Sequence, residues 1–176
     1  MSPAVLIELV DLRDGGPGLD SVLNNLLQLY EYDFSEILGG DVDASGRYSL
    51  VWPMSDYWQA PDQHAFLFRA DGQWAGLALV GRYSYLNESP GDTRVIAEFF
   101  VMRKYRRQGV GEEMARRLFD RFPGRWEVGQ VIENTGAQAF WRTVIGRYTG
   151  GQYTEQAVAN KRWTGPVQAF DSARRG

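Results

Sequence analysis

Hydrophobic positions recur along this chain in two periods. Residues 5–10 and 95–102 are mostly apolar and, with residues 126–131, have the length and composition of β-strands. Apolar side chains spaced by three or four positions predict amphipathic helices at residues 19–30 and 110–122. Strands and helices therefore follow one another along the chain, which indicates an α/β (α+β) fold.

Turn residues divide the rest of the chain. Residues 65–69 and 74–80 are two apolar runs joined by Asp71-Gly72, which predicts a β-hairpin. Residues 41–63 are rich in turn formers and predict a long ordered loop. A helix over 136–145 and a closing hairpin within 148–163 complete the pattern. We expect a single domain at residues 1–165, followed by a C-terminal tail at residues 166–176.

Composition excludes several classes of chemistry. The 176 residues include no cysteine and one histidine, His64, so a thiolate nucleophile, a disulfide framework and a multi-histidine metal site are all excluded. We therefore expect no metal. No apolar run approaches the length of a membrane span, and no charged-then-apolar leader is present. The expected protein is cytoplasmic and binds no membrane.

Charge is segregated along the chain. Residues 14–46 contain seven acidic side chains and no lysine or arginine, whereas residues 103–125 contain eight basic and three acidic side chains. Each region taken alone is compatible with an ordinary solvated surface. Together they favour one side of the molecule that binds an anion and another that binds a cation. The net charge of −3 and the confinement of the bases to one segment argue against nucleic acid.

A basic, glycine-containing turn joins the strand predicted at 95–102 to the helix predicted at 110–122. Its cationic side chains are Arg103, Lys104, Arg106 and Arg107, and Gly109 and Gly111 follow them. The first N–H groups of a helix have no partner within the helix, and the helix dipole is positive at this end. Glycine lets a backbone approach phosphate oxygens closely. This arrangement predicts an anion-binding site.

The motif Arg106-x-x-Gly109-x-Gly111, preceded by Phe100-Val101-Met102, resembles the coenzyme A loop of the GNAT superfamily of N-acetyltransferases. A second similar element is Asn134-x-x-Ala137-x-x-Phe140-Trp141. The Rossmann and P-loop fingerprints are both absent. The resemblance implies a single GNAT domain with a mixed, mostly antiparallel sheet and helices on both faces. Two strands splay apart in that fold and hold coenzyme A.

The resemblance also implies site residues. Those expected to contact acetyl-CoA are Phe100, Val101, Met102, Arg106, Arg107, Gln108, Gly109, Val110, Gly111, Glu112, Asn134, Ala137, Phe140 and Trp141. Phe140 and Trp141 are equally compatible with core packing. Those expected to form an acceptor wall of aromatic and acidic side chains are Tyr30, Glu31, Asp33 and Phe34, which would suit a protonated amine. An ordinary amphipathic helix end is the alternative for this second set.

Two residues are candidates for proton transfer. Glu98 is a carboxylate in an otherwise apolar strand and is the expected base for the amine; its alternative is an ion pair with Arg82 or Arg94. Many GNAT proteins have a tyrosine acid where this chain has Trp141, and an indole is no useful acid. Tyr148 is the expected substitute.

The predicted activity is acetyl-CoA-dependent acetylation of a primary amine on a cationic small molecule or peptide. Direct transfer is implied because the chain has no cysteine to carry the acyl group. A non-catalytic acyl-CoA-binding module and an anion-binding domain without coenzyme A are the alternatives. A homodimer is compatible with the family.

Overall fold

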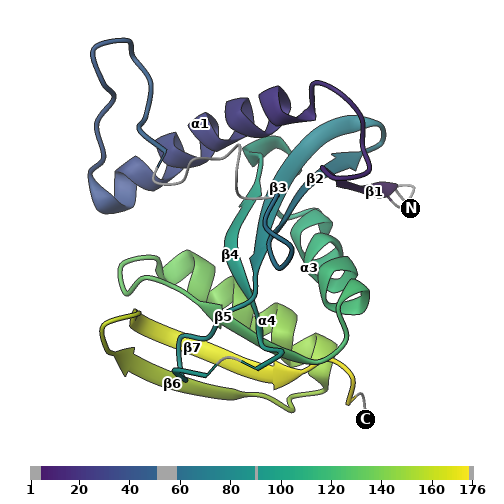
Figure 1. The fold of residues 1–176 in the computed structure, drawn as a ribbon, viewed down its shortest axis with the longest axis vertical. Helices are drawn as coiled ribbons and strands as arrows, with labels where there is room; N and C mark the ends of the chain where they lie inside the picture. Colours follow the sequence, from purple (N-terminus) through teal and green to yellow (C-terminus); the bar gives the residue numbers. More distant parts are fainter. Residues whose placement is uncertain (1–4, 51–58, 90, 175–176) are drawn as a thin grey trace. The chain divides into compact units, whose positions relative to one another are not determined.

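The computed structural model describes residues 5–50, 59–89 and 91–174. Its helices and strands are shown in Figure 1. They are β1 (Ile7–Asp11), α1 (Leu19–Leu38), β2 (His64–Ala70), β3 (Gln73–Gly81), β4 (Arg94–Val101), the 3₁₀ helix η1 (Arg103–Tyr105), α3 (Val110–Arg121), β5 (Arg125–Gly129), α4 (Thr135–Thr149), β6 (Thr154–Ala159) and β7 (Thr164–Asp171). The strand order β1-β2-β3-β4-β5-β7-β6 makes one mixed, mostly antiparallel sheet, which confirms the predicted fold class.

The chain forms two compact units. The first comprises residues 1–79 and 98–110, and the second comprises residues 80–97 and 111–176. β3 and β4 each contribute residues to both units.

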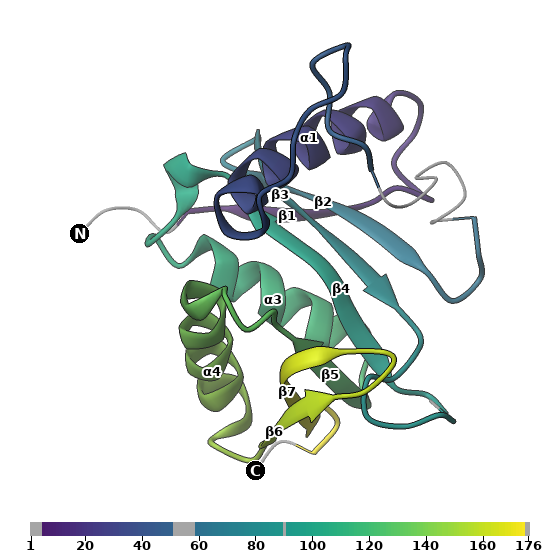
Figure 2. The ribbon, with the colours of Figure 1, turned by 90° about the vertical axis from the view of Figure 1, so that its left-hand side faces the viewer.

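In the first unit, α1 runs alongside the strands (Figures 1 and 2). The buried face of α1 consists of Leu23, Leu26, Leu27 and Tyr30, at the predicted helical spacing. The helix begins at Leu19 after Gly18, whose φ of 88° is a left-handed conformation. No side chain caps this end of the helix, because glycine takes the left-handed conformation at the N-cap position.

The first unit also holds the antiparallel pair β1–β2 and the end of β4. Ile7 lies opposite Ala70 in the β1–β2 register. The Met102 N–H donates to the Ala75 carbonyl at 2.8 Å, so backbone hydrogen bonding continues to the start of the basic turn.

In the second unit, β5 lies between β4 and β7. The first three residues of β4, Arg94–Ile96, pair in parallel with Trp126–Val128 of β5. β7 pairs antiparallel with both β5 and β6. α4 packs against this group of strands, as Figure 1 shows.

Two boundaries near the C-terminus differ from expectation. α4 continues four residues past the predicted end at Ile145, so Tyr148 is helical and not part of a hairpin. Residues 166–171, expected as the start of a tail, belong to β7, where Val167 and Gln168 are fully buried and Phe170 is 7% exposed. The boundary after residue 165 is therefore wrong. Pro166 has no N–H, but its carbonyl accepts the Gln130 N–H at 3.1 Å, so the chain is tied to the end of β5 at this residue.

The described residues contain no helix long and apolar enough to span a membrane. The aromatic residues Trp52, Tyr57 and Trp58 of the predicted 41–63 loop lie outside the described residues.

Candidate functional site

The predicted anion site is a tight turn that leads into α3. η1 follows β4, and α3 begins at Val110. Two residues of the turn have left-handed backbones: Arg107 with a φ of 62° and Gly109 with a φ of 79°. A Cβ on Gly109 would meet open space, so its conformation, and not crowding, requires glycine. The turn therefore places the N-terminus of α3 directly after the basic residues, an arrangement that suits a phosphate group.

Arginine side chains of this turn are held by Asp33 of α1. Arg103 approaches Asp33 at 2.8 Å through Nη2 and 2.9 Å through Nε, and Arg106 pairs with the other carboxylate oxygen. Arg106 Nε also donates to the Val101 carbonyl at 2.8 Å. Asp33, predicted to face an amine, instead contacts the predicted phosphate loop. Lys104, Arg107 and Gln108 are exposed.

Glu98 is the second point at which α1 contacts β4. Its Oε2 accepts a hydrogen bond from the hydroxyl of Tyr30. The Tyr30 ring lies 4.8 Å from the ring of Phe34 and 5.8 Å from that of Phe100, between centroids. Glu98 is half-buried and Tyr30 is 8% exposed. The structure thus brings two predicted acceptor residues together with the predicted base.

Glu31 lies beside this cluster in sequence and is half-buried. Burial raises the pKa of its carboxyl above the ordinary value, because a charged carboxylate loses hydration. A cation that bound at Glu31 would offset this loss.

The predicted residues of α4 occupy its first two turns. Asn134 caps the helix, since its Oδ1 accepts the Ala137 N–H at 3.0 Å. Ala137 and Phe140 are half-buried, whereas Trp141 is 5% exposed and its ring lies 5.0 Å from that of Phe140. Trp141 is therefore a core side chain of the second unit.

Tyr148 lies in the last turn of α4. Its hydroxyl donates to Asp120 of α3 at 2.8 Å, and its ring packs 5.1 Å from Phe119. With Val144 and the charged side chains of Glu112, Arg116 and Arg147, it lines a shallow pocket of about 150 Å³. Its role as an acid stays a prediction, because Glu98 belongs to the first unit and Tyr148 to the second.

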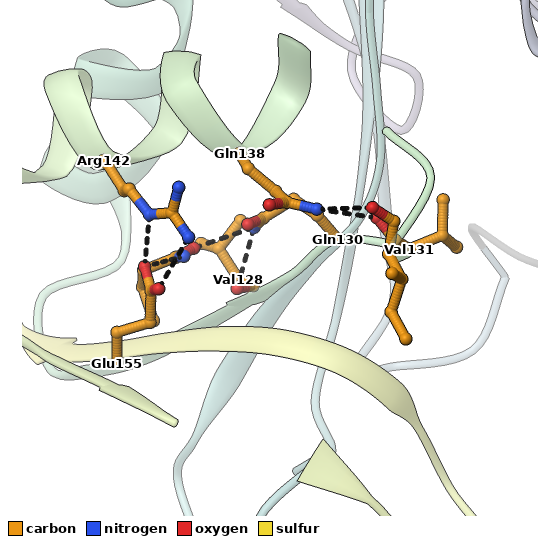
Figure 3. Close-up of polar contacts among 8 residues, drawn as sticks. Val128, Gln130, Val131, Gln138, Arg142 and Glu155 are labelled. Atoms are coloured by element: carbon orange, nitrogen blue, oxygen red, sulfur yellow. Dashed lines mark hydrogen bonds and ion pairs between the residues drawn. The ribbon is translucent and has the colours of Figure 1, made fainter. Parts of the chain in front are cut away.

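Sequence reasoning missed a polar chain in the second unit that ends at Gln130. Figure 3 shows it, from Arg142 of α4 through Glu155 of β6 to Gln130 at the end of β5. Its members are far apart in sequence, and only the pairing of β5, β7 and β6 brings them together.

The model of the acetyltransferase (GNAT) family matches residues 26–146. No curated protein matches the chain significantly.

Solved structures share the fold at low sequence identity. An acetyltransferase from Thermus thermophilus has 13% identity and a TM-score of 0.65, over 96% of this chain and 98% of that one. Spermidine N-acetyltransferase from Vibrio cholerae, solved with CoA and spermine, has 10% identity and a TM-score of 0.62, over 95% and 96%. An aminoglycoside acetyltransferase from an uncultured soil metagenomic sample, solved with sisomicin, has 17% identity and a TM-score of 0.59, over 92% and 96%.

The Asn134 cap predicts a stability change. Asn134→Ala should lower the free energy of unfolding by about 1 kcal/mol, since the Ala137 N–H loses its acceptor. Urea denaturation at pH 7 measures this change. Asn134→Asp retains an acceptor oxygen and serves as the control. An unchanged midpoint for the alanine variant would show that the cap contributes nothing.

The raised pKa of Glu31 predicts a pH-dependent stability difference. The folded protein holds the proton of Glu31 more tightly than the unfolded chain does. The contribution of Glu31 to the free energy of unfolding is therefore most favourable below its pKa in the unfolded chain. It is lost as pH rises through the folded pKa. Wild type should therefore lose stability relative to Glu31→Gln as pH rises above the ordinary glutamate pKa of about 4.3. Thermal melts of both proteins over a series of pH values measure the difference, with Glu36→Gln, an exposed position on the same helix, as control. A constant difference would contradict the assignment.

Proposed function

Because the chain belongs to the GNAT acetyltransferase family, we propose that it transfers an acetyl group from acetyl-CoA to a primary amine of a cationic acceptor. The observation that carries this proposal is the turn from β4 into α3. It combines a helix N-terminus, Gly109 in a left-handed conformation and a cluster of arginines. These residues fit the diphosphate of coenzyme A, which needs N–H donors and positive charge.

We assign cofactor contacts to three segments. The turn and first helical residues, 106–112, would hold the diphosphate. The backbone of residues 100–102 would bind the pantetheine arm, and the N–H of Val101 would stabilise a developing oxyanion. Asn134, Ala137, Phe140 and Trp141 stay predictions from the family resemblance. Of these, the buried position of Trp141 supports a packing role more than a ligand contact.

Bound acetyl-CoA supplies the acetyl group as a thioester, which an unprotonated amine can attack. An alkylammonium has a pKa of about 10.4, so near neutral pH the protein must remove its proton. Glu98 is the proposed base. The hydroxyl of Tyr30 donates to one of its oxygens, which orients the carboxylate.

The acceptor is proposed to be a small molecule or a peptide with several positive charges. This proposal rests on the acidic and aromatic side chains of α1, with Glu31 as the half-buried carboxylate that gains most from a cation. The spermidine and aminoglycoside acetyltransferases that share the fold act on polycationic amines by name. Cytoplasmic location and a homodimer remain expectations.

A non-catalytic acyl-CoA-binding module is the second candidate. Two observations favour it: Trp141 occupies the usual position of the acid, and the Tyr148 hydroxyl already donates to Asp120.

Release of free thiol from acetyl-CoA, followed with a thiol-reactive dye over a panel of amines, separates the two candidates. The chain contributes no background because it has no cysteine. Amine-dependent release would establish the transferase. Binding of acetyl-CoA without release for any amine would favour the binding module.

Glu98→Gln should lower kcat/KM for the amine by about 100-fold or more, the usual contribution of a general base. Its affinity for acetyl-CoA should stay within about twofold, because the substitution conserves shape. Steady-state kinetics and calorimetry measure the two quantities. Glu36→Gln is the matched control, and normal turnover by Glu98→Gln would rule out this base.

Asp33→Asn should tighten acetyl-CoA binding by about two- to fivefold. The substitution frees Arg103 and Arg106 from a partly exposed ion pair of the strength usual at surfaces. The gain should shrink as salt is raised, because the phosphate contacts are screened. Calorimetry at two salt concentrations measures it, with the exposed Asp41→Asn as control. Weaker binding would mean that Asp33 positions the arginines and does not compete for them.

A further inference from the structure

The loop that follows α1 is fastened back onto the helix by the side chain of Gln28. Residues 39–50 project away from α1 and then return to it (Figures 1 and 2). At the return, Gln28 Nε2 donates to the Tyr48 carbonyl at 3.0 Å, and Gln28 Oε1 accepts the Tyr48 N–H at 2.8 Å. Both residues are half-buried. One side-chain amide therefore satisfies both backbone polar groups of Tyr48, as a neighbouring strand would.

The tip of this loop is a compact turn built on Asp43. Its Oδ1 accepts the Ser45 N–H at 2.8 Å, the Ser45 hydroxyl at 2.6 Å and the Arg47 N–H at 3.2 Å. The Asp43 N–H in turn donates to the Arg47 carbonyl at 2.8 Å. Val42 pairs with Tyr48 in an antiparallel bridge. These contacts join the two arms of the loop to each other, so the turn can move as one body.

Two glycines connect the turn to α1. Gly39 ends the helix with a φ of 74°, and its N–H donates to the Ser35 carbonyl at 2.9 Å. Gly40 follows with a φ outside the left-handed region, and a Cβ on either glycine would meet open space. Residues 41–47 are exposed. Because glycine has more backbone freedom than any other residue, this pair suits a pivot between the helix and the turn.

We propose that residues 41–48 form a flap, which Gln28 latches onto α1 and which opens about Gly39 and Gly40. Opening exchanges the two hydrogen bonds of the latch for bonds to water and leaves those within the turn intact, so it is a local event of low cost. Gln28 lies one helical turn before the half-buried Glu31, so the flap opens beside that carboxylate. The flap does not depend on the proposed function, and its test needs no ligand.

Trypsin can detect the open flap at one peptide bond. Arg47 is the only lysine or arginine between residues 14 and 68, and the bond after it leads to Tyr48, whose backbone the latch holds. Gln28→Met preserves side-chain length and removes both hydrogen bonds. It should speed cleavage after Arg47 by about 10- to 50-fold, the usual effect of two hydrogen bonds, because cleavage follows the population of the open state. Mass spectrometry of the fragments over time measures the rate.

A second variant acts at the pivot, in the opposite direction. Gly40→Ala fits the closed flap and restricts the open one, so it should slow cleavage after Arg47 by about two- to fivefold. It also keeps the test available if Gln28→Met does not fold. Asn25→Met, at an exposed polar position of α1, is the matched control and should leave the rate unchanged. Cleavage after Arg69, within β2, reports global unfolding in every variant.

Three results would overturn the inference. An unchanged rate of cleavage after Arg47 in Gln28→Met would mean that the amide does not hold the loop. Equal acceleration after Arg47 and Arg69 would mean that Gln28 stabilises the whole unit and latches no flap. Faster cleavage in Gly40→Ala would mean that the closed loop itself requires glycine there, so that Gly40 is no pivot. Faster cleavage confined to Arg47 in Gln28→Met, with slower cleavage in Gly40→Ala, would establish the flap.

Discussion

The ion pairs of Asp33 hold the basic turn of the first unit against α1. The turn after β4 carries four cationic side chains within five residues, and their mutual repulsion is costly without an anion nearby. Asp33 supplies one carboxylate to Arg103 and Arg106. Residues 30, 33 and 34 share one face of α1, and Tyr30 donates to Glu98 from that face. The predicted phosphate loop and the proposed base therefore both contact one face of α1.

The acidic and aromatic residues of α1 do not all have the same surroundings. The sequence predicts a single wall facing an amine, formed by Tyr30, Glu31, Asp33 and Phe34. In the structure, Tyr30 and Asp33 face β4 and the loop that follows it, while Phe34 packs on Tyr30. Glu31 is the member of the set whose raised pKa reflects burial without a compensating charge. Part of the acidic stretch, Asp33, thus balances the basic loop, and Glu31 is the part proposed to bind a cation.

The local parts of this fold were predictable and the non-local parts were not. Apolar spacing and glycine placement are local signals, so the strand, the basic turn and the helix of residues 94–121 were predicted within a few residues. β7 was missed because the pairing that buries Gln168, with β5 on one edge and β6 on the other, is not visible in the sequence. The same pairing creates the amide chain to Gln130. Buried polar networks of this kind depend on contacts between distant segments, which periodicity does not encode.

The proposed reaction depends more on the base than on an acid. A thiol has a pKa of about 8.5, so a thiolate is a tolerable leaving group near neutral pH, whereas an amine with a pKa of about 10.4 must lose its proton before it can attack. The structure matches this asymmetry. Glu98 is half-buried and held by Tyr30, whereas Tyr148 would have to break its hydrogen bond to Asp120 and leave a phenolate beside a carboxylate. The presence of Trp141 at the usual acid position is therefore compatible with catalysis.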